Sequence, residues 1–294
     1  VLRGPQGTLF GRNSTVGAVL LRSAGPQDEL AGSAELTYGN FNEQKFVGTF
    51  NAPLGEKFAL RLAGLTDKRD GYAHNRYDDK DFATAESDAF RVGAKWDITE
   101  NLTWTVKYDW SRMGGDGKAE LEILPETLTA ASRARLGLIM GGNPPDLDDA
   151  FDRQSNQRIT GDVDDKQWGV VSDLSWELAG GHTVRFLSGY RDWSNEQLES
   201  DVLFMPADFL ARTGRYESTS QSYELQLISP VDQLWNGRLD YVAGLYYFQE
   251  DYFIGEQFGL GADFCGLVPV AQRPACAASG NKANATALGF NQDA

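Results

Sequence analysis

Ten consecutive residues, from Leu102 to Ser111, alternate strictly between apolar and polar side chains. The apolar set is Leu102, Trp104, Val106, Tyr108 and Trp110, and the polar set is Thr103, Thr105, Lys107, Asp109 and Ser111. Successive side chains of a β-strand point to opposite faces, whereas at helical spacing the same residues would scatter around the axis. The run therefore predicts a strand with one apolar face and one polar face.

The same period recurs and predicts about nine strands of roughly ten residues each, between about Gly32 and Asp251. The alternating stretches are 33–38, 45–52, 58–63, 90–98, 102–111, 167–177, 183–191, 222–227 and 239–247. Roughly ten residues is the length that a tilted strand needs to cross a bilayer. We therefore expect an all-β protein whose antiparallel strands form part of a transmembrane β-barrel.

The predicted connections are short at one end of the strands and mostly long at the other. Short turns are expected at 53–56, 99–101, 179–181 and 231–237, a tight connection near residue 40, and long loops at 71–85, 114–166, 194–220 and from 253 onward. Outer-membrane barrels have short periplasmic turns and long extracellular loops. A soluble β-sandwich also alternates but need not sort its loops in this way, so the sorting favours the membrane barrel.

Aromatic residues and charge support this interpretation. Several rings on the apolar faces lie near predicted strand ends, as in the girdles at the rims of a barrel. They are Trp96, Trp104, Trp110, Trp168, Trp176, Tyr108 and Tyr247.

No stretch approaches 18 consecutive apolar residues, so no transmembrane helix is expected. The formal net charge of -15 argues against nucleic acid as a partner, because phosphates require a basic face.

The first 24 residues lack the alternation of a lipid-crossing hairpin. Glycine and proline punctuate 3–8 and 11–15 before a short apolar run at 17–21, which indicates the end of a compact element, with 23–30 as a link. The chain starts without methionine or a signal peptide, and its last residues carry no closing pattern. We therefore expect both ends to be internal to a longer sequence.

The run Val-Leu-Arg-Gly-Pro-Gln-Gly-Thr-Leu-Phe-Gly-Arg-Asn-Ser-Thr-Val-Gly-Ala-Val at 1–19 closely resembles the end of the plug domain of TonB-dependent outer-membrane receptors. Its position just before a predicted barrel is the right one for that family. Val16 stands where the family usually has the first of two glycines, and the strand at 20–26 is less basic than many. The resemblance is specific over the first 26 residues and architectural over the rest.

This resemblance implies a plug domain that fills a barrel of about 22 strands. Residues 1–26 would be the C-terminal end of the plug, and residues 27–294 the N-terminal part of a truncated barrel. The implied function is active import of a scarce ligand, most commonly a ferric siderophore, driven by the TonB–ExbB–ExbD complex through an N-terminal TonB box outside this chain. Oligosaccharides, vitamins and haem are the alternative ligands. Outer-membrane lipid and lipopolysaccharide would surround the barrel, and neither catalytic residues nor a cofactor is implied.

Two arginines and four glycines of the first segment follow from the same resemblance. Arg3 and Arg12 resemble plug arginines that pair with carboxylates of the barrel wall, with solvation of a turn as the alternative. The glycines would meet backbone requirements rather than bind ligand. They are Gly4, Gly7, Gly11 and Gly17.

Aromatic and imidazole side chains in the predicted extracellular loops are the candidates for ligand contact, although the sequence selects none of them. They are Tyr72, His74, Tyr77, Trp193, Tyr216 and Phe253. Cys265 and Cys276 lie in the last loop, where a secreted setting favours a disulfide worth roughly 3 kcal/mol over a metal pair. The longest loop is acidic, and solvation explains its carboxylates better than a cation site, because EF-hand spacing is absent. They are Asp146, Asp148, Asp149, Asp152, Asp162, Asp164 and Asp165.

Two other classes of protein compete with the importer. A passive porin would lack the plug-like sequence of the first residues, so that motif decides against it. A soluble β-rich carbohydrate-binding or adhesion protein remains the alternative, and it would partition into buffer without detergent.

Overall fold

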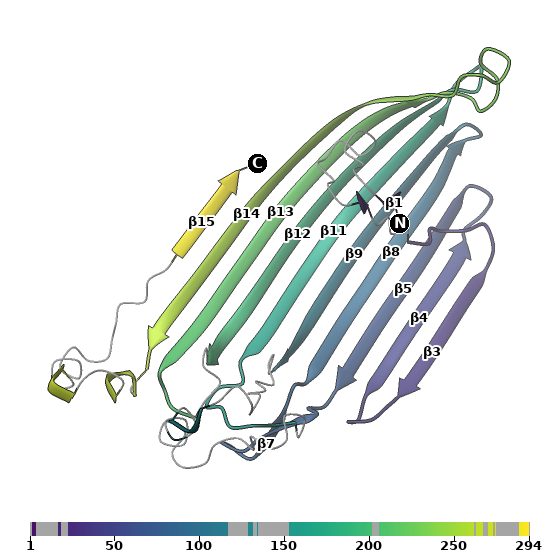
Figure 1. The fold of residues 1–294 in the computed structure, drawn as a ribbon. Coiled ribbons are helices and arrows are strands. Elements are labelled where there is room, and N and C mark those ends of the chain that lie inside the picture. The colour runs from purple at the N-terminus through teal and green to yellow at the C-terminus, as the bar shows by residue number, and fades with distance from the viewer. Residues whose placement is uncertain are drawn as a thin grey trace.

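The computed structural model describes residues 2–3, 17–18, 23–116, 129–131, 134, 153–201, 206–261, 263–266, 270–272, 274 and 288–293. Its main element is one antiparallel sheet with the strand order β15-β14-β13-β12-β11-β9-β8-β5-β4-β3 (Figure 1). These strands are β3 (Ala31–Tyr38), β4 (Gln44–Pro53), β5 (Phe58–Arg69), β8 (Ala85–Thr99), β9 (Leu102–Asp116), β11 (Asp162–Glu177), β12 (Thr183–Asp201), β13 (Leu210–Ile228), β14 (Val242–Leu260) and β15 (Leu288–Asp293). Each strand pairs with the next one of the sheet along the chain, so the sheet is a meander.

The remaining elements are short. A two-stranded ribbon joins β1 (Leu2–Arg3) to β2 (Gly17–Ala18), and a second small sheet contains β6 (Ala73–Asn75), β7 (Lys80–Phe82) and β10 (Gln154–Ser155). Two 3-10 turns, η2 (Phe264–Gly266) and η3 (Val270–Gln272), follow β14. Over the described residues, no helix combines the length and the apolar character that crossing a membrane requires.

The nine predicted strands correspond to β3 through β14 of the main sheet, and β15 is an additional strand. Short connections at 54–57, 100–101, 178–182 and 229–241 lie at one end of the strands, as predicted, and this is the end that is expected to be periplasmic. The predicted loops at 194–220 and from 253 onward are wrong in extent, because β12, β13 and β14 each run for 19 residues. In the extended part of β12 and β13 both faces are mostly polar, and in β14 the adjacent Tyr252, Phe253 and Ile254 interrupt the alternation, but backbone pairing continues.

The outward face of the sheet carries two aromatic rims. Strand register aligns Phe90, Trp110 and Trp168 in one row, and the rings of Phe90 and Trp110 stack at 5.7 Å. Trp176 ends the apolar side of β11 at the periplasmic rim, where it remains exposed. Trp168 and Trp176 are separated by roughly 26 Å of strand at about 3.3 Å per residue. This is comparable with the apolar band of about 25 Å in outer-membrane barrels.

The upper edge of this apolar band descends across the sheet, as expected for tilted strands. The outward-facing ring at this edge is Trp168 on β11, Tyr190 on β12, and the paired Tyr223 and Tyr247 on β13 and β14, and the next two outward positions of β14 are the polar Gln249 and Asp251. Beyond Tyr247, β14 continues to Leu260 and remains paired with β13 throughout. The strands β12 to β14 therefore extend well above the membrane band on the extracellular side.

The small sheet β6-β7-β10 connects two extracellular segments that are far apart in sequence. Phe82 is 1% exposed and packs with Ala73 and Ala83. Asn75 exchanges hydrogen bonds with the backbone of Gln157, donating to its carbonyl at 2.9 Å and accepting from its N–H at 3.0 Å. This buried pairing holds the β5–β8 connection against the segment that precedes β11.

Similar contacts join this segment to the β12–β13 connection and to the residues that follow β14. Arg158 pairs with Asp208 at 2.7 Å, and the backbone N–H of Asp208 donates to Asp263 at 2.8 Å. The N–H of Gly261 donates to the carbonyl of Phe209 at 2.9 Å. The extracellular ends of the strands are therefore joined to one another by direct contacts.

Candidate ligand-facing site on the polar wall

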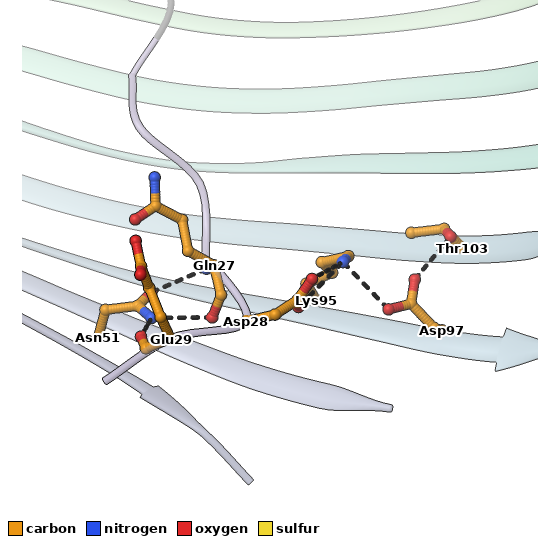
Figure 2. A network of polar contacts seen from close by, with 7 residues as sticks. All are labelled: Gln27, Asp28, Glu29, Asn51, Lys95, Asp97 and Thr103. Atoms are coloured by element: carbon orange, nitrogen blue, oxygen red, sulfur yellow. Dashed lines mark hydrogen bonds and ion pairs between the residues drawn. The ribbon is translucent and has the colours of Figure 1, made fainter. Parts of the chain in front are cut away.

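The link between β2 and β3 crosses the polar face of the main sheet, where Asn51 of β4 holds it (Figure 2). The side-chain amide of Asn51 accepts from the N–H of Gln27 at 2.9 Å and donates to the carbonyls of Gln27 at 2.8 Å and Glu29 at 2.6 Å. Asn51 is 0% exposed. The buried amide of Asn51 thus finds its hydrogen-bond partners in the backbone of the link.

Charged residues hold the rest of the link. Lys95 of β8 contacts Asp28 at 3.2 Å and Asp97 at 3.0 Å, as Figure 2 shows. Lys107 of β9 donates to the carbonyl of Ser23 at 3.0 Å and to its hydroxyl at 3.2 Å. The segment that follows the plug-like sequence is therefore fixed to the polar wall across β4, β8 and β9.

Further along this wall, ion pairs bridge neighbouring strands. Asp109 contacts Arg191 at 3.1 Å and Arg91 at 3.8 Å, and Arg185 binds Asp173 through two hydrogen bonds. All of these side chains are at least half-buried in the polar surface. A wall with this pattern faces water that is shielded from bulk solvent, as in the lumen of a barrel.

An aromatic pair lies on the polar wall towards the extracellular end. Trp193 of β12 and Tyr252 of β14 stack with ring centroids 6.4 Å apart and planes at 10°, across Ser218 of β13. The indole N–H of Trp193 donates to Asp165 at 3.0 Å, and Asn195 donates to the same carboxylate oxygen at 2.8 Å. Two flat rings beside a carboxylate form a surface suited to an organic ligand.

A second polar group lies farther from the membrane, nine residues beyond Tyr247 along β14. Glu256 accepts from Tyr216 at 2.5 Å and from Arg212 at 2.5 Å, and Arg212 also donates to Tyr216. These hydrogen bonds, from Tyr216 first and then from Arg212, hold the pKa of the Glu256 carboxyl below its ordinary value. Glu256 is therefore ionised at neutral pH, and the group is a fixed charged element at the top of the wall.

Comparisons with known proteins were made by sequence and by structure. No family model matches the chain. The ferrioxamine B receptor of Salmonella typhimurium strain LT2 is 31% identical over 108 residues, which are 36% of this chain and 13% of that receptor. The ferrioxamine receptor of Yersinia enterocolitica is 35% identical over 77 residues, which are 26% of this chain and 11% of that receptor. The matched part is thus a small share of either curated relative.

Similar solved structures cover nearly all of the chain. The ferric yersiniabactin uptake receptor of Yersinia pestis superposes with a TM-score of 0.68 at 13% identity, covering 88% of this chain and 36% of that one. The ferripyoverdine receptor of the Pseudomonas aeruginosa outer membrane gives 0.61 at 16%, covering 87% and 32%. The fold of this chain is therefore that of part of the barrel wall of these outer-membrane receptors. The polar face of the main sheet corresponds to the lumenal face of such a barrel.

Of the predicted ligand-contact residues, Trp193 and Tyr216 lie on the polar face of the main sheet. They lie in β12 and β13 rather than in loops, so their predicted loop location is wrong. Phe253 is also in a strand, β14, but it faces outward and is 37% exposed, whereas the adjacent Tyr252 joins Trp193. The position of Phe253 follows from the alternation that starts at the outward Tyr247.

Tyr72, His74 and Tyr77 lie apart from this group, in the connection between β5 and β8 that contributes to the small sheet. Tyr72 packs against Phe41 at 6.1 Å, with the guanidinium of Arg69 5.0 Å from its ring centroid. His74 lies 3.1 Å from Asp81 through Nδ1. Contact of these three residues with a ligand stays a prediction, and Tyr77 is the most exposed of them.

Some of the other predicted residues lie outside the described residues. Arg3 pairs with Gly17 in the β1–β2 ribbon, whereas Gly4, Gly7, Gly11, Arg12 and Cys276 lie outside the described residues. The proposed roles of Arg3 and Arg12 in plug–barrel contact stay predictions. Cys265 is disulfide-bonded and buried.

The acidic loop predicted between 146 and 165 is only partly a loop. Asp162, Asp164 and Asp165 lie in β11, and the earlier carboxylates lie outside the described residues. These are Asp146, Asp148, Asp149 and Asp152. Within the described residues, no cluster of histidine, cysteine and carboxylate side chains is placed to hold a metal ion.

Two residues of the polar wall, Asn51 and Tyr252, were not predicted from the sequence. Asn51 stands among the polar positions of its strand, and no local pattern distinguishes an amide that binds a distant backbone. Tyr252 could have been found by continuing the alternation of β14 past Tyr247, because even-numbered positions of that strand face the lumen.

Proposed function

We propose that this receptor takes up a ferric siderophore across the outer membrane, driven by the TonB complex. The observation that carries the proposal is the link at 23–30, which runs along the lumenal wall and is held there by Asn51, Lys95 and Lys107. A chain that enters the lumen from a plug-like motif fits a gated importer, whereas a passive porin has no need of such a link. The names of the relatives, ferrioxamine receptors, favour an iron ligand over an oligosaccharide, a vitamin or haem.

The two parts of the chain would have different roles in uptake. Residues 1–26 would end the plug domain, and residues 27–294 would form the first part of the barrel wall. The ligand would meet the lumenal surface above the membrane band, where Trp193, Tyr252 and Tyr216 are placed. Because uptake requires binding and release but no bond cleavage, the receptor needs neither catalytic residues nor a cofactor.

The link would stay attached to the barrel wall throughout transport. Energy transmitted by TonB would act on the part of the plug that precedes the link, while the link stays bonded to the wall. Rearrangement of the plug would then open a passage beside a stationary lumenal surface. Lipopolysaccharide and outer-membrane lipid would contact the outward aromatic band.

The experiment is growth and iron uptake by a strain that lacks the full-length gene, with and without the gene supplied in trans. Under iron limitation, the complemented strain should accumulate radioactive iron from a ferric hydroxamate siderophore, and deletion of TonB should abolish this uptake. Induction and growth on an oligosaccharide alone, without siderophore-dependent iron uptake, would remove the proposal. A gene product that fractionates as soluble protein would do the same.

A further inference from the structure

The aromatic pair of the lumenal wall has a carboxylate on each side. Asp165 lies one cross-strand row above the row that contains Trp193 and Tyr252, and Glu250 lies one row below it. The hydroxyl of Ser218, between the rings, donates to Glu250 at 3.1 Å. Trp193 and Tyr252 are half-buried, so ring surface is available to the lumen.

The charges around the pair do not cancel. Over three rows of β8 to β14, the lumenal face carries the carboxylates of Asp109, Asp165 and Glu250 and the guanidinium groups of Arg91 and Arg191, and Arg91 lies beside Asp109 at 3.8 Å. Arg191 is engaged by Asp109 at 3.1 Å and by Gln167 at 3.0 Å. The carboxylates beside the rings therefore exceed the cations there.

Asp165 is held by neutral donors. The indole of Trp193 and the amide of Asn195 both donate to Oδ2, and within the described residues no contact uses Oδ1. A carboxylate that is fixed in place but not neutralised can accept a charge-assisted hydrogen bond from a ligand. The adjacent ring faces attract the same kind of ligand, because the π-system of tryptophan or tyrosine is electron-rich.

We propose that Trp193, Tyr252 and Asp165 bind a primary ammonium group of the transported siderophore. This inference rests on the proposed function and narrows it to a ferric hydroxamate with a free amine, of the ferrioxamine B type. In such a complex the hydroxamates neutralise the ferric ion and the amine leaves a net positive charge. A ferric catecholate is strongly anionic, and the carboxylates of this surface would repel it.

A matched pair of ligands isolates the ammonium group. Ferrioxamine B and its N-acetylated form share the ferric hydroxamate core, but only the first carries the charge. We expect the full-length receptor in detergent to bind ferrioxamine B about tenfold more tightly than the acetylated complex, since a desolvated cation on aromatic rings and a carboxylate gains about that factor. Fluorescence titration or competition with radioactive iron complex measures both affinities.

Two isosteric variants on one strand provide the control. Asp165→Asn keeps an acceptor for Trp193 but removes the charge, and should bring the two affinities together by weakening ferrioxamine B alone. Asp164→Asn makes the same charge change on the outward face, where Asp164 contacts Arg112 and Lys166, and should leave the preference intact. Equal effects of the two variants would mean general electrostatic attraction and would overturn the inference.

The remaining outcomes separate the inference from the proposed function. Equal binding of both complexes by the wild-type receptor would overturn the ammonium site and leave siderophore uptake standing. If no ferric siderophore of either charge bound, the proposed function itself would fail. Loss of the preference in Trp193→Leu, with the acetylated complex still bound, would support the site and show that the variant is folded.

Discussion

The side-chain amide of Asn51 binds both the backbone N–H and the backbone carbonyl of Gln27, in the way that the backbones of neighbouring strands bind each other. Asn51 accepts from the N–H of Gln27 at 2.9 Å and donates to its carbonyl at 2.8 Å. The link thereby gains a β-like partner on a face of the sheet that carries no strand. One buried side chain thus supplies the hydrogen bonds that the backbone of a neighbouring strand would otherwise provide.

Replacement of Asn51 by alanine should loosen the link without unfolding the wall. The change removes the hydrogen bonds that hold the backbone of Gln27 and Glu29, each worth about 0.5–1.5 kcal/mol. Proteolysis of the full-length receptor should therefore reveal faster cleavage within 23–30. Ser33→Ala, which removes an exposed hydroxyl contact with Thr49, is the control and should not change the cleavage rate.

Asn75→Ala should separate the β5–β8 connection from the segment before β11. The variant removes both hydrogen bonds to the buried backbone of Gln157, and the expected loss is about 2 kcal/mol of local stability. Hydrogen exchange of residues 73–82 and 154–157 should accelerate together. If only one of the two segments exchanged faster, the contact would not be what couples them. Tyr77→Ala, at a half-exposed ring, serves as the matched control.

Neighbouring aromatic residues of β14 should differ in their effect on ligand binding. Tyr252→Ala should weaken ferric siderophore binding about tenfold, because stacking with Trp193 and the ring surface in the lumen are lost. Phe253→Ala should leave affinity unchanged, since its side chain faces away from the lumen. A larger loss from Phe253→Ala than from Tyr252→Ala would contradict the assignment of the two faces.

Cys265 should not react with a thiol reagent in the folded receptor, because its sulfur is held in a disulfide. We expect no reaction with maleimide until a reductant is added, because the cysteine is bonded and buried. Cys265→Ser should lower stability by roughly 3 kcal/mol in the region after β14, measured by its proteolytic susceptibility. Labelling of the untreated receptor with one maleimide per chain would indicate a free thiol and contradict this expectation.

The strands within the membrane band could be predicted because lipid imposes an apolar outward face on them. The run from Leu102 to Ser111 is a clear example, and it forms most of β9. Above the band that constraint disappears, so the outward positions of β14 beyond Tyr247 include Gln249 and Asp251, and sequence reasoning ended the strand too early. The lumenal site lies largely in this part of the wall.

Long-range contacts set a different limit on prediction. The pairing of Asn75 with Gln157 joins residues 82 positions apart, and no local pattern indicates it. Trp193 was recognised as an aromatic candidate, but its partner Tyr252 depends on the register of three strands. Residue types could therefore be anticipated, while their grouping required the sheet.

The paired extension of β13 and β14 above the membrane band limits what substitutions in the connecting loops can change. From Tyr247 to Leu260 the two strands remain paired, over about 43 Å of strand. A ligand that descends towards the membrane therefore passes a stiff surface whose shape is fixed by backbone pairing. Substitutions in the connections beyond the paired strands would therefore leave the shape of this stretch of wall unchanged.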